Sequence, residues 1–124
     1  MNSACAGSSH FIATGLLTIA EGANKSDASQ IFRNLLLSEK ARAEAIPELE
    51  VLAQDVSAAH GAASAPVDKN QMHYLMSRGL SPEESQAMIV NGFLLNAFSN
   101  LTNKYLIEEM RTRLTVHLEC ELKR

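Results

Sequence analysis

A change of hydrophobic pattern near residue 67 constrains the fold of this chain more than any other feature of its sequence. Before that point, short runs of apolar and β-branched residues are separated by turn residues, which is the pattern of β-strands. Three such runs lie at residues 10–19, 29–37 and 46–56, with no helical period between them. Short strands at near-regular spacing suit the stacked turns of a solenoid as well as a sandwich, and the spacing leaves both open.

The sequence after the third run predicts a linker and then a helix. Residues 59–67 carry small side chains, one glycine and one proline without apolar periodicity, which is typical of a connection or of the frayed end of a strand. Asp68 with Gln71 predicts a capping box at the start of a first helix. Gly79, directly after Arg78, predicts the left-handed residue that ends it.

Two further helices are predicted beyond Gly79. Ser81, Pro82 and Glu84 form a strong helix start, with a side-chain cap, a proline at the first position and a capping-box glutamate. A third helix is expected over residues 101–122. Its predicted inward face consists of Leu106, Met110, Leu114 and Leu118. These patterns place a boundary between a strand domain, residues 1–65, and a helical domain, residues 66–124.

Composition excludes several classes of protein. The 124 residues carry a formal net charge of −3 without a basic block, so no nucleic-acid partner is expected. No apolar run approaches the roughly 20 residues that a membrane-spanning helix needs, so no membrane partner is expected. Cys5 and Cys120 lie at opposite ends of a chain whose start does not resemble a signal peptide. This arrangement predicts reduced thiols and a cytoplasmic location.

Several stretches of the sequence occur in the order found in one known family. They are GANKSDASQIFRNLLLS, RNLLLSEKARAEAIPELEVLAQDV, HGA, SRGLSPEE and IVNGF. Together they resemble the C-terminal portion of the SufB/SufD family, the scaffold proteins of SUF iron–sulfur cluster assembly. The resemblance implies a β-plus-α fold in which the last turns of a right-handed parallel β-helix precede a small C-terminal helical domain.

The resemblance also implies partners. Family members hold the ATPase SufC through their helical C-terminal segments and dimerise through their β-helices. Residues 68–98 are therefore the expected SufC-docking region, with surface contacts at Tyr74, Arg78, Glu83 and Glu84. The same residues are also accounted for by capping and solvating the helices. A homodimer or a SufB/SufD pair is expected, since a β-helix cut across its axis leaves strand edges unpaired.

His60 is the residue that the resemblance implies for the cluster-building interface. Its imidazole could bind iron or transfer a proton, although a histidine at a strand end more commonly bonds a loop carbonyl. The thiols that some relatives carry are replaced here by Ala58 and Phe32, and a SufB glutamate by Gly61. A cluster is therefore expected only transiently at the assembled complex, with no resident cofactor and no metal site. The missing thiols favour SufD and IVNGF favours SufB, so both alternatives stay open.

Two other functions compete with the scaffold. One is a degenerate, non-catalytic module that binds SufC or a paralogue without building a cluster. The other is a β-helix enzyme acting on polysaccharide, which needs paired carboxylates on one face. Glu48 and Glu50 share a strand face, but they are more simply a solvated edge. His73 and His117 are expected to be ordinary helix residues, and Cys5 an inert thiol. The sequence therefore predicts a scaffold, and no enzyme.

Overall fold

The computed structural model describes the backbone of residues 1–122 and the side chains as far as residue 118. The chain forms two compact units, one of strands within Ser3–Ala65 and one of helices that begins at Pro66. The β-plus-α class predicted from the sequence is confirmed. None of the described helices combines the length and apolar character that crossing a membrane requires.

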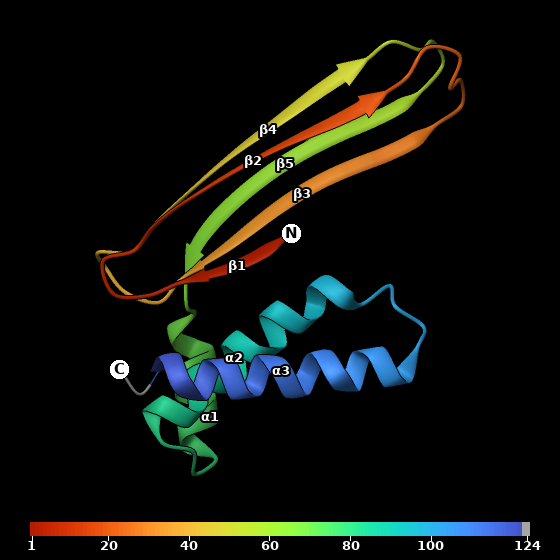
Figure 1. The fold of residues 1–124 in the computed structure, drawn as a ribbon. Helices are drawn as coiled ribbons and strands as arrows, with labels where there is room; N and C mark the ends of the chain where they lie inside the picture. Colours follow the sequence, from red (N-terminus) through yellow and green to blue (C-terminus); the bar gives the residue numbers. More distant parts are fainter. Residues whose placement is uncertain (123–124) are drawn as a thin grey trace. The chain divides into compact units, whose positions relative to one another are not determined.

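Five strands form two small sheets in the first unit (Figure 1). One sheet has three strands in the order β1-β3-β5, and the other pairs β2 with β4. The chain alternates between the sheets from β2 to β5, so strands of one sheet are never consecutive. The bounds are β1 Asn2–Cys5, β2 His10–Ile19, β3 Asp27–Leu36, β4 Arg42–Val51 and β5 Ser57–Pro66.

The strands within each sheet run in the same direction. Every residue of β2 lies beside the residue one turn later on β4, from His10 with Arg42 to Ile19 with Val51. In the other sheet, the Leu37 amide donates to the Cys5 carbonyl at 2.8 Å, and the bonds advance together along both strands. The turns between strands stack as well: the Lys25 amide donates to the Asp55 carbonyl at 2.7 Å. The repeat of the unit is therefore one turn of about thirty residues.

The core of this unit lies between the two sheets. Because side chains alternate along a strand, every second residue of β2 points to the interior, and Ala13 and Ile19 are buried there. Phe32 of β3 is only 3% exposed. A Cβ built on Gly15 would lie 2.8 Å from the tip of the Phe32 ring and would also clash with the Gln30 amide. Glycine at position 15 therefore makes room for the largest side chain in this core.

A polar ladder with a buried centre also runs across one sheet of the strand unit. The Ser3 hydroxyl donates to Asn34 Oδ1 at 2.7 Å, and Asn34 Nδ2 donates to the Ser64 hydroxyl at 3.1 Å. Asn34 is 3% exposed, so both ends of its amide need partners. Ser3, Asn34 and Ser64 belong to β1, β3 and β5, so the ladder ties the three strands of one sheet together.

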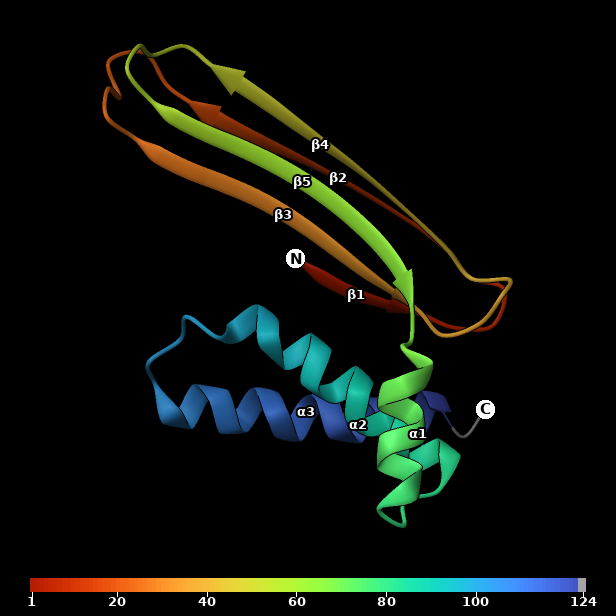
Figure 2. The same cartoon turned by 180° about the vertical axis from the view of Figure 1, so that it is seen from behind.

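Three α-helices make up the second unit, and α2 and α3 lie side by side in both views (Figures 1 and 2). The helices are α1 Lys69–Ser77, α2 Pro82–Leu95 and α3 Lys104–Leu122, with a short 3-10 turn at Asn96–Phe98. Val90 of α2 is fully buried. The inward face predicted for α3 is partly wrong, because Leu106 is 49% exposed whereas Met110, Leu114 and Leu118 are half-buried.

The helix ends follow the signals read from the sequence. Ser81 and Glu84 form the predicted capping box: Ser81 Oγ accepts from the Glu84 amide, and Glu84 Oε2 accepts from the Ser81 amide. The Leu80 and Gly79 amides donate back to Leu75 and Met76, which is the Schellman arrangement, with Gly79 at φ +97°.

Three predictions of local structure are wrong. The strand expected at residues 46–56 is β4, Arg42–Val51, so residues 52–56 lie outside it. Residues 59–67 were expected to be a linker or the frayed end of a strand, but most of them belong to the regular strand β5, which obtains its backbone partners from β3. Small side chains carry a weak strand signal, so stacking on β3 decides their conformation. The capping box of Asp68 is also incomplete, because Asp68 caps the Asn70 amide and no bond from Gln71 completes it.

Candidate functional site

His60 lies on β5, an outer strand of its sheet, and its side chain is exposed. It shares a strand face with Ser64, four residues later, whose hydroxyl completes the polar ladder. The imidazole is therefore held on a regular strand and is accessible from outside. A ring nitrogen in that position is able to bind a metal or to exchange a proton at a surface.

The positions at which some relatives carry thiols have different surroundings. Phe32 fills the core between the sheets, so this position lies inside the strand unit and away from its surface. Ala58 is half-buried two residues before His60. Across the described part of the chain, no three His, Cys, Asp or Glu side chains gather closely enough to hold a metal ion. The thiol of Cys5 is free and buried on β1.

The four predicted partner contacts all lie in the helical unit. Tyr74 and Arg78 are neighbours on successive turns at the end of α1. The Arg78 guanidinium lies 5.2 Å from the centre of the Tyr74 ring, within range of a cation–π contact. Both residues are exposed, and Tyr74 retains 58% of its accessible surface. The pair presents an aromatic ring and a cation together on one surface.

Glu83 and Glu84 open α2, but their roles differ. Glu84 is part of the capping box, so its carboxylate is already bonded to the Ser81 amide at 2.8 Å. Glu83, in the same first turn, is exposed and takes no part in that box. Of the two carboxylates, Glu83 is the one free to meet a partner without loosening the helix end.

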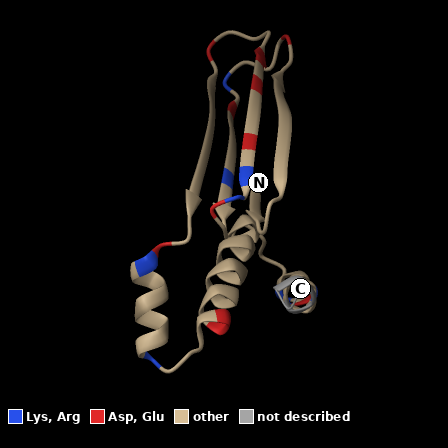
Figure 3. Cartoon of the chain, turned by 90° about the vertical axis from the view of Figure 1, so that its left-hand side faces the viewer, with Lys and Arg blue, Asp and Glu red and all other residues tan. Residues whose placement is uncertain are grey.

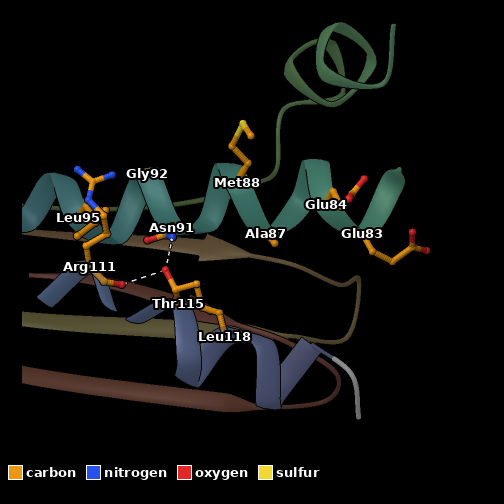
Figure 4. Close-up of a pocket in the computed structure, with 10 residues that line it drawn as sticks. All are labelled: Glu83, Glu84, Ala87, Met88, Asn91, Gly92, Leu95, Arg111, Thr115 and Leu118. Atoms are coloured by element: carbon orange, nitrogen blue, oxygen red, sulfur yellow. Dashed lines mark hydrogen bonds between the residues drawn. The ribbon is translucent and has the colours of Figure 1, made fainter. Parts of the chain in front are cut away.

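A groove of about 880 Å³ lies between α2 and α3, and both glutamates stand along it (Figure 4). Its lining comes from successive turns of the two helices, with Arg111 on α3 as its cation. The lining residues are Glu83, Glu84, Ala87, Met88, Asn91, Gly92, Leu95, Arg111, Thr115 and Leu118. The groove is thus apolar along its length, with carboxylates on α2 and a guanidinium on α3.

Asn91 and Thr115 connect the two walls of this groove. Asn91 Nδ2 donates to Thr115 Oγ1 at 3.1 Å, and this bond fixes the spacing of α2 and α3 (Figure 4). Thr115 Oγ1 in turn donates to the Arg111 carbonyl at 2.9 Å. Asn91 Oδ1 is buried without a partner among the described residues.

A second, smaller hollow of about 440 Å³ lies between α1 and α2. Tyr74 lines it on α1, and Met88 lines both this hollow and the larger groove. Met88 is 53% exposed, and a flexible thioether suits a surface that adapts to a partner. The sequence identified Tyr74 and the glutamates, but it did not indicate Asn91, Arg111 or Met88 as parts of one surface. For Asn91, Arg111 and Met88, the sequence predicted only that they lie on helices.

Comparison with known proteins gives one consistent answer. The family model described as "SUF system FeS cluster assembly, SufBD core domain" matches residues 1–93. The iron-sulfur cluster assembly protein SufD of Bacillus subtilis is 39% identical over 112 residues, which cover 90% of this chain and 25% of that protein. SufD of Escherichia coli is 33% identical over 100 residues, covering 81% of this chain and 24% of that protein.

A third relative gives the same result. An iron-sulfur cluster assembly SufBD family protein of Mycobacterium tuberculosis is 34% identical over 115 residues, covering 92% of this chain and 28% of that protein. The chain thus spans about a quarter of the length of the curated relatives that it matches. The match includes both the strand unit and the start of the helical unit.

Proposed function

Since this chain belongs to the SufBD family of iron–sulfur cluster assembly proteins, we propose that it serves as a SufB/SufD-type scaffold segment in a SUF complex. The observation that carries this proposal is the family match over residues 1–93, which runs through the stacked strands and into α2. In this role the chain binds partner proteins and presents an interface for cluster assembly. It does not act as an enzyme.

The strand unit, in this proposal, forms the last turns of a right-handed parallel β-helix. Its support is the repeat along the chain: Thr18 bonds to Glu50 across 32 residues, and Asn34 bonds to Ser64 across 30. Strands that alternate between two sheets and pair in parallel after each turn are what such a coil requires. A right-handed coil is expected because parallel crossover connections are right-handed in nearly all proteins.

The helical unit, residues 66–124, docks the SufC ATPase. Support comes from the position of the exposed Tyr74–Arg78 pair beside the smaller hollow and of Glu83 beside the larger groove. Aromatic and arginine side chains beside a groove are typical of residues that dominate binding energy at protein interfaces. A shift of these helices on nucleotide binding by SufC would be transmitted through residue 66 to β5.

The strand unit supports dimer formation with a second copy or with a SufB/SufD paralogue. β4 and β5 each lie at the edge of a sheet, so their outer backbone groups need partners. His60 lies on β5, so pairing at this edge would bring its imidazole to the interface. Iron and sulfide are cargo there, and His60 supplies one nitrogen ligand while the partner must supply others.

Co-purification with SufC tests the docking proposal. Tagged chain, mixed with purified SufC, is expected to retain it, and the double variant Tyr74→Ala, Arg78→Ala is expected to weaken retention about tenfold or more. Tyr105→Ala is the matched control, because Tyr105 lies on α3 outside both hollows and is 89% exposed. No retention of SufC by the unmodified chain would reject docking.

Anaerobic reconstitution with iron and sulfide tests the role of His60. The chain, together with SufC and a SufB/SufD partner, is expected to build less cluster when His60 is replaced by alanine. His73→Ala, an exposed histidine on α1, is the control and should build as much as the unmodified chain. Cluster yield is read from visible absorbance, and equal yields from both variants would remove His60 from the site.

A second candidate function is a degenerate module that binds SufC or a paralogue without building a cluster. The replacement of thiols by Ala58 and by the buried Phe32 favours it. This alternative predicts SufC retention without any effect of His60→Ala on cluster yield. The two experiments together therefore separate a cluster scaffold from a binding module.

A further inference from the structure

The outer face of the β2–β4 sheet carries a surface that neither cluster assembly nor SufC docking uses. Because side chains alternate, the even-numbered residues of both strands are exposed, while the odd-numbered ones turn inward apart from Val51 at the end of β4. Three of the exposed side chains are large and aliphatic: Ile12, Leu16 and Ile46 are 55%, 59% and 46% exposed.

The register places these three side chains together. Ile46 lies beside Thr14, so it is diagonal to both Ile12 and Leu16 on the same face. Diagonal neighbours on a sheet are about 7–8 Å apart, within reach of large side chains. We call Ile12, Leu16 and Ile46 the aliphatic triangle. Covering three exposed aliphatic side chains removes apolar surface from water, which lowers the free energy.

Carboxylates lie along the β4 side of this triangle. Glu44 and Glu48 flank Ile46 on β4, and Glu50 follows; Figure 3 shows the acidic positions in red along one strand. Glu44 Oε1 lies within hydrogen-bond distance of His10 Nε2, at 2.7 Å, and Glu50 accepts from the Thr18 hydroxyl at 3.3 Å. Glu48, in contrast, lies opposite the aliphatic Leu16. Arg42 is the cation of this face, so the three carboxylates outnumber it.

We propose that the aliphatic triangle and its carboxylates bind a basic amphipathic helix of a partner protein. An amphipathic helix is one of the elements that cover the face of a sheet. Residues four apart on a helix are separated by about 6 Å along its axis, and residues two apart on a strand by about 6.6 Å, so the side-chain rows match. Lysine or arginine beside the aliphatic contacts would then meet Glu44, Glu48 and Glu50.

The charge of this face selects against other occupants. Nucleic acid and anionic lipid would meet the carboxylates with like charge. Two copies related by a two-fold axis would bring the same carboxylates against each other, which disfavours self-association through this face. A basic helix is the occupant that covers the aliphatic triangle and pairs the carboxylates together.

A pair of labelled synthetic helices tests this proposal. Each has about 15–20 alanine-rich residues with two leucines four apart, flanked by lysines in one peptide and by glutamates in the other. Fluorescence anisotropy with the full chain is expected to give at least about tenfold tighter binding of the lysine peptide. Equal affinity for both peptides, or no saturable binding of either, would overturn the proposal.

Matched isoleucine variants locate the binding. Ile46→Thr keeps a β-branched side chain and is expected to weaken binding of the lysine peptide about tenfold. Ile31→Thr on β3, where Ile31 is 47% exposed, is the control and should bind as the unmodified chain does. Far-UV circular dichroism confirms that both variants fold. Equal weakening by both would overturn the proposal, as would light scattering that shows a dimer lost only in Ile46→Thr.

Discussion

The contacts that stabilise the strand unit differ in sequence range from those that stabilise the helical unit. In the strand unit, the bonds that define the fold join residues about thirty positions apart, as Asn34 and Ser64 do. In the helical unit, the ends of α1 and α2 are fixed by bonds over two to five residues, as Ser81 and Glu84 show. One unit is therefore specified by its stacking and the other mainly by local signals.

The difference has a consequence for stability. An interior side chain of a stacked turn contacts the turns or sheet around it, so its loss weakens several strands at once. A helix cap satisfies a few backbone groups at one end, so its loss is confined to that end. Substitutions of equal size should therefore have larger effects in the strand unit.

The two units can be followed separately in solution. Both tyrosines, Tyr74 and Tyr105, lie in the helical unit, and the chain has no tryptophan. Tyrosine fluorescence during urea unfolding thus reports on the helices, while far-UV circular dichroism reports on both units. Each variant below is measured with both signals.

Replacing Phe32 by alanine should give the largest effect. Phe32 fills the space above Gly15 between the sheets, and removing a buried phenylalanine typically lowers the free energy of unfolding by about 3–5 kcal/mol. The loss should appear in circular dichroism more than in tyrosine fluorescence. Ile31→Ala, the exposed neighbour, should lose less than about 1 kcal/mol, and a similar loss in both variants would contradict the assignment of the core.

Replacing Asn34 by alanine should have an intermediate effect. It removes both bonds of a buried amide and leaves the Ser3 and Ser64 hydroxyls without that partner, at an expected loss of about 2 kcal/mol. Ser64→Ala removes one of the two bonds at an exposed position and should cost about half as much or less. If Asn34→Ala were neutral, the ladder would contribute nothing to holding the sheet.

Replacing Ser81 by alanine should lower the free energy of unfolding by about 1 kcal/mol, the usual contribution of a serine N-cap. The change should be seen in tyrosine fluorescence, because the cap belongs to the helical unit. Ser81→Asp, which can also accept from the Glu84 amide, should restore most of the loss. If Ser81→Ala lowers the free energy of unfolding but Ser81→Asp lowers it as much, the loss does not come from the missing cap.

Replacing Arg113 by alanine should have the smallest effect. Arg113 donates to Glu109 at 2.7 Å on the exposed side of α3, and such pairs contribute about 0.3–0.5 kcal/mol. Raising the salt concentration to about 1 M should remove most of that difference, since screening acts strongly on exposed charges. A loss above about 1 kcal/mol would mean that the stability of α3 depends on more than its packing and its backbone bonds.

The helical unit could be read from the sequence to a large extent. The Ser81 capping box and the Schellman end at Gly79 are confirmed, because each depends on residues within one turn of a helix. The incomplete box at Asp68 and the exposed Leu106 are the exceptions. Both depend on which side chains meet after packing, which local spacing does not determine.

The strand unit was only partly predictable. The strand at residues 10–19 is confirmed with its bounds, since its residues are apolar and β-branched and turn residues follow. Most of β5 was expected to be a linker or the frayed end of a strand, because its alanines, serines and glycine carry little strand signal of their own. Its conformation follows from the backbone partners offered by β3, thirty residues earlier.

The candidate surfaces were also predictable only in part: the sequence indicated individual residues, but not what surrounds them. Tyr74, Arg78, Glu83 and Glu84 could be selected as exposed residues of capped helices, and family resemblance indicated His60. Their surroundings could not be predicted: the Asn91–Thr115 bond and the groove beside it join residues of separate helices. The aliphatic triangle likewise depends on the register between β2 and β4.

By itself, the sequence determined where α1 ends and α2 begins, that residues 10–19 form a strand, and to which family the chain is similar. These properties depend on neighbouring residues or on the order of whole motifs. Only the tertiary structure decided that small residues form β5, that Asn34 lies in a buried ladder, and that Ile12, Leu16 and Ile46 meet on one face. The physical reason is that backbone and side-chain partners a full turn away select among conformations that local preferences leave nearly equal in free energy.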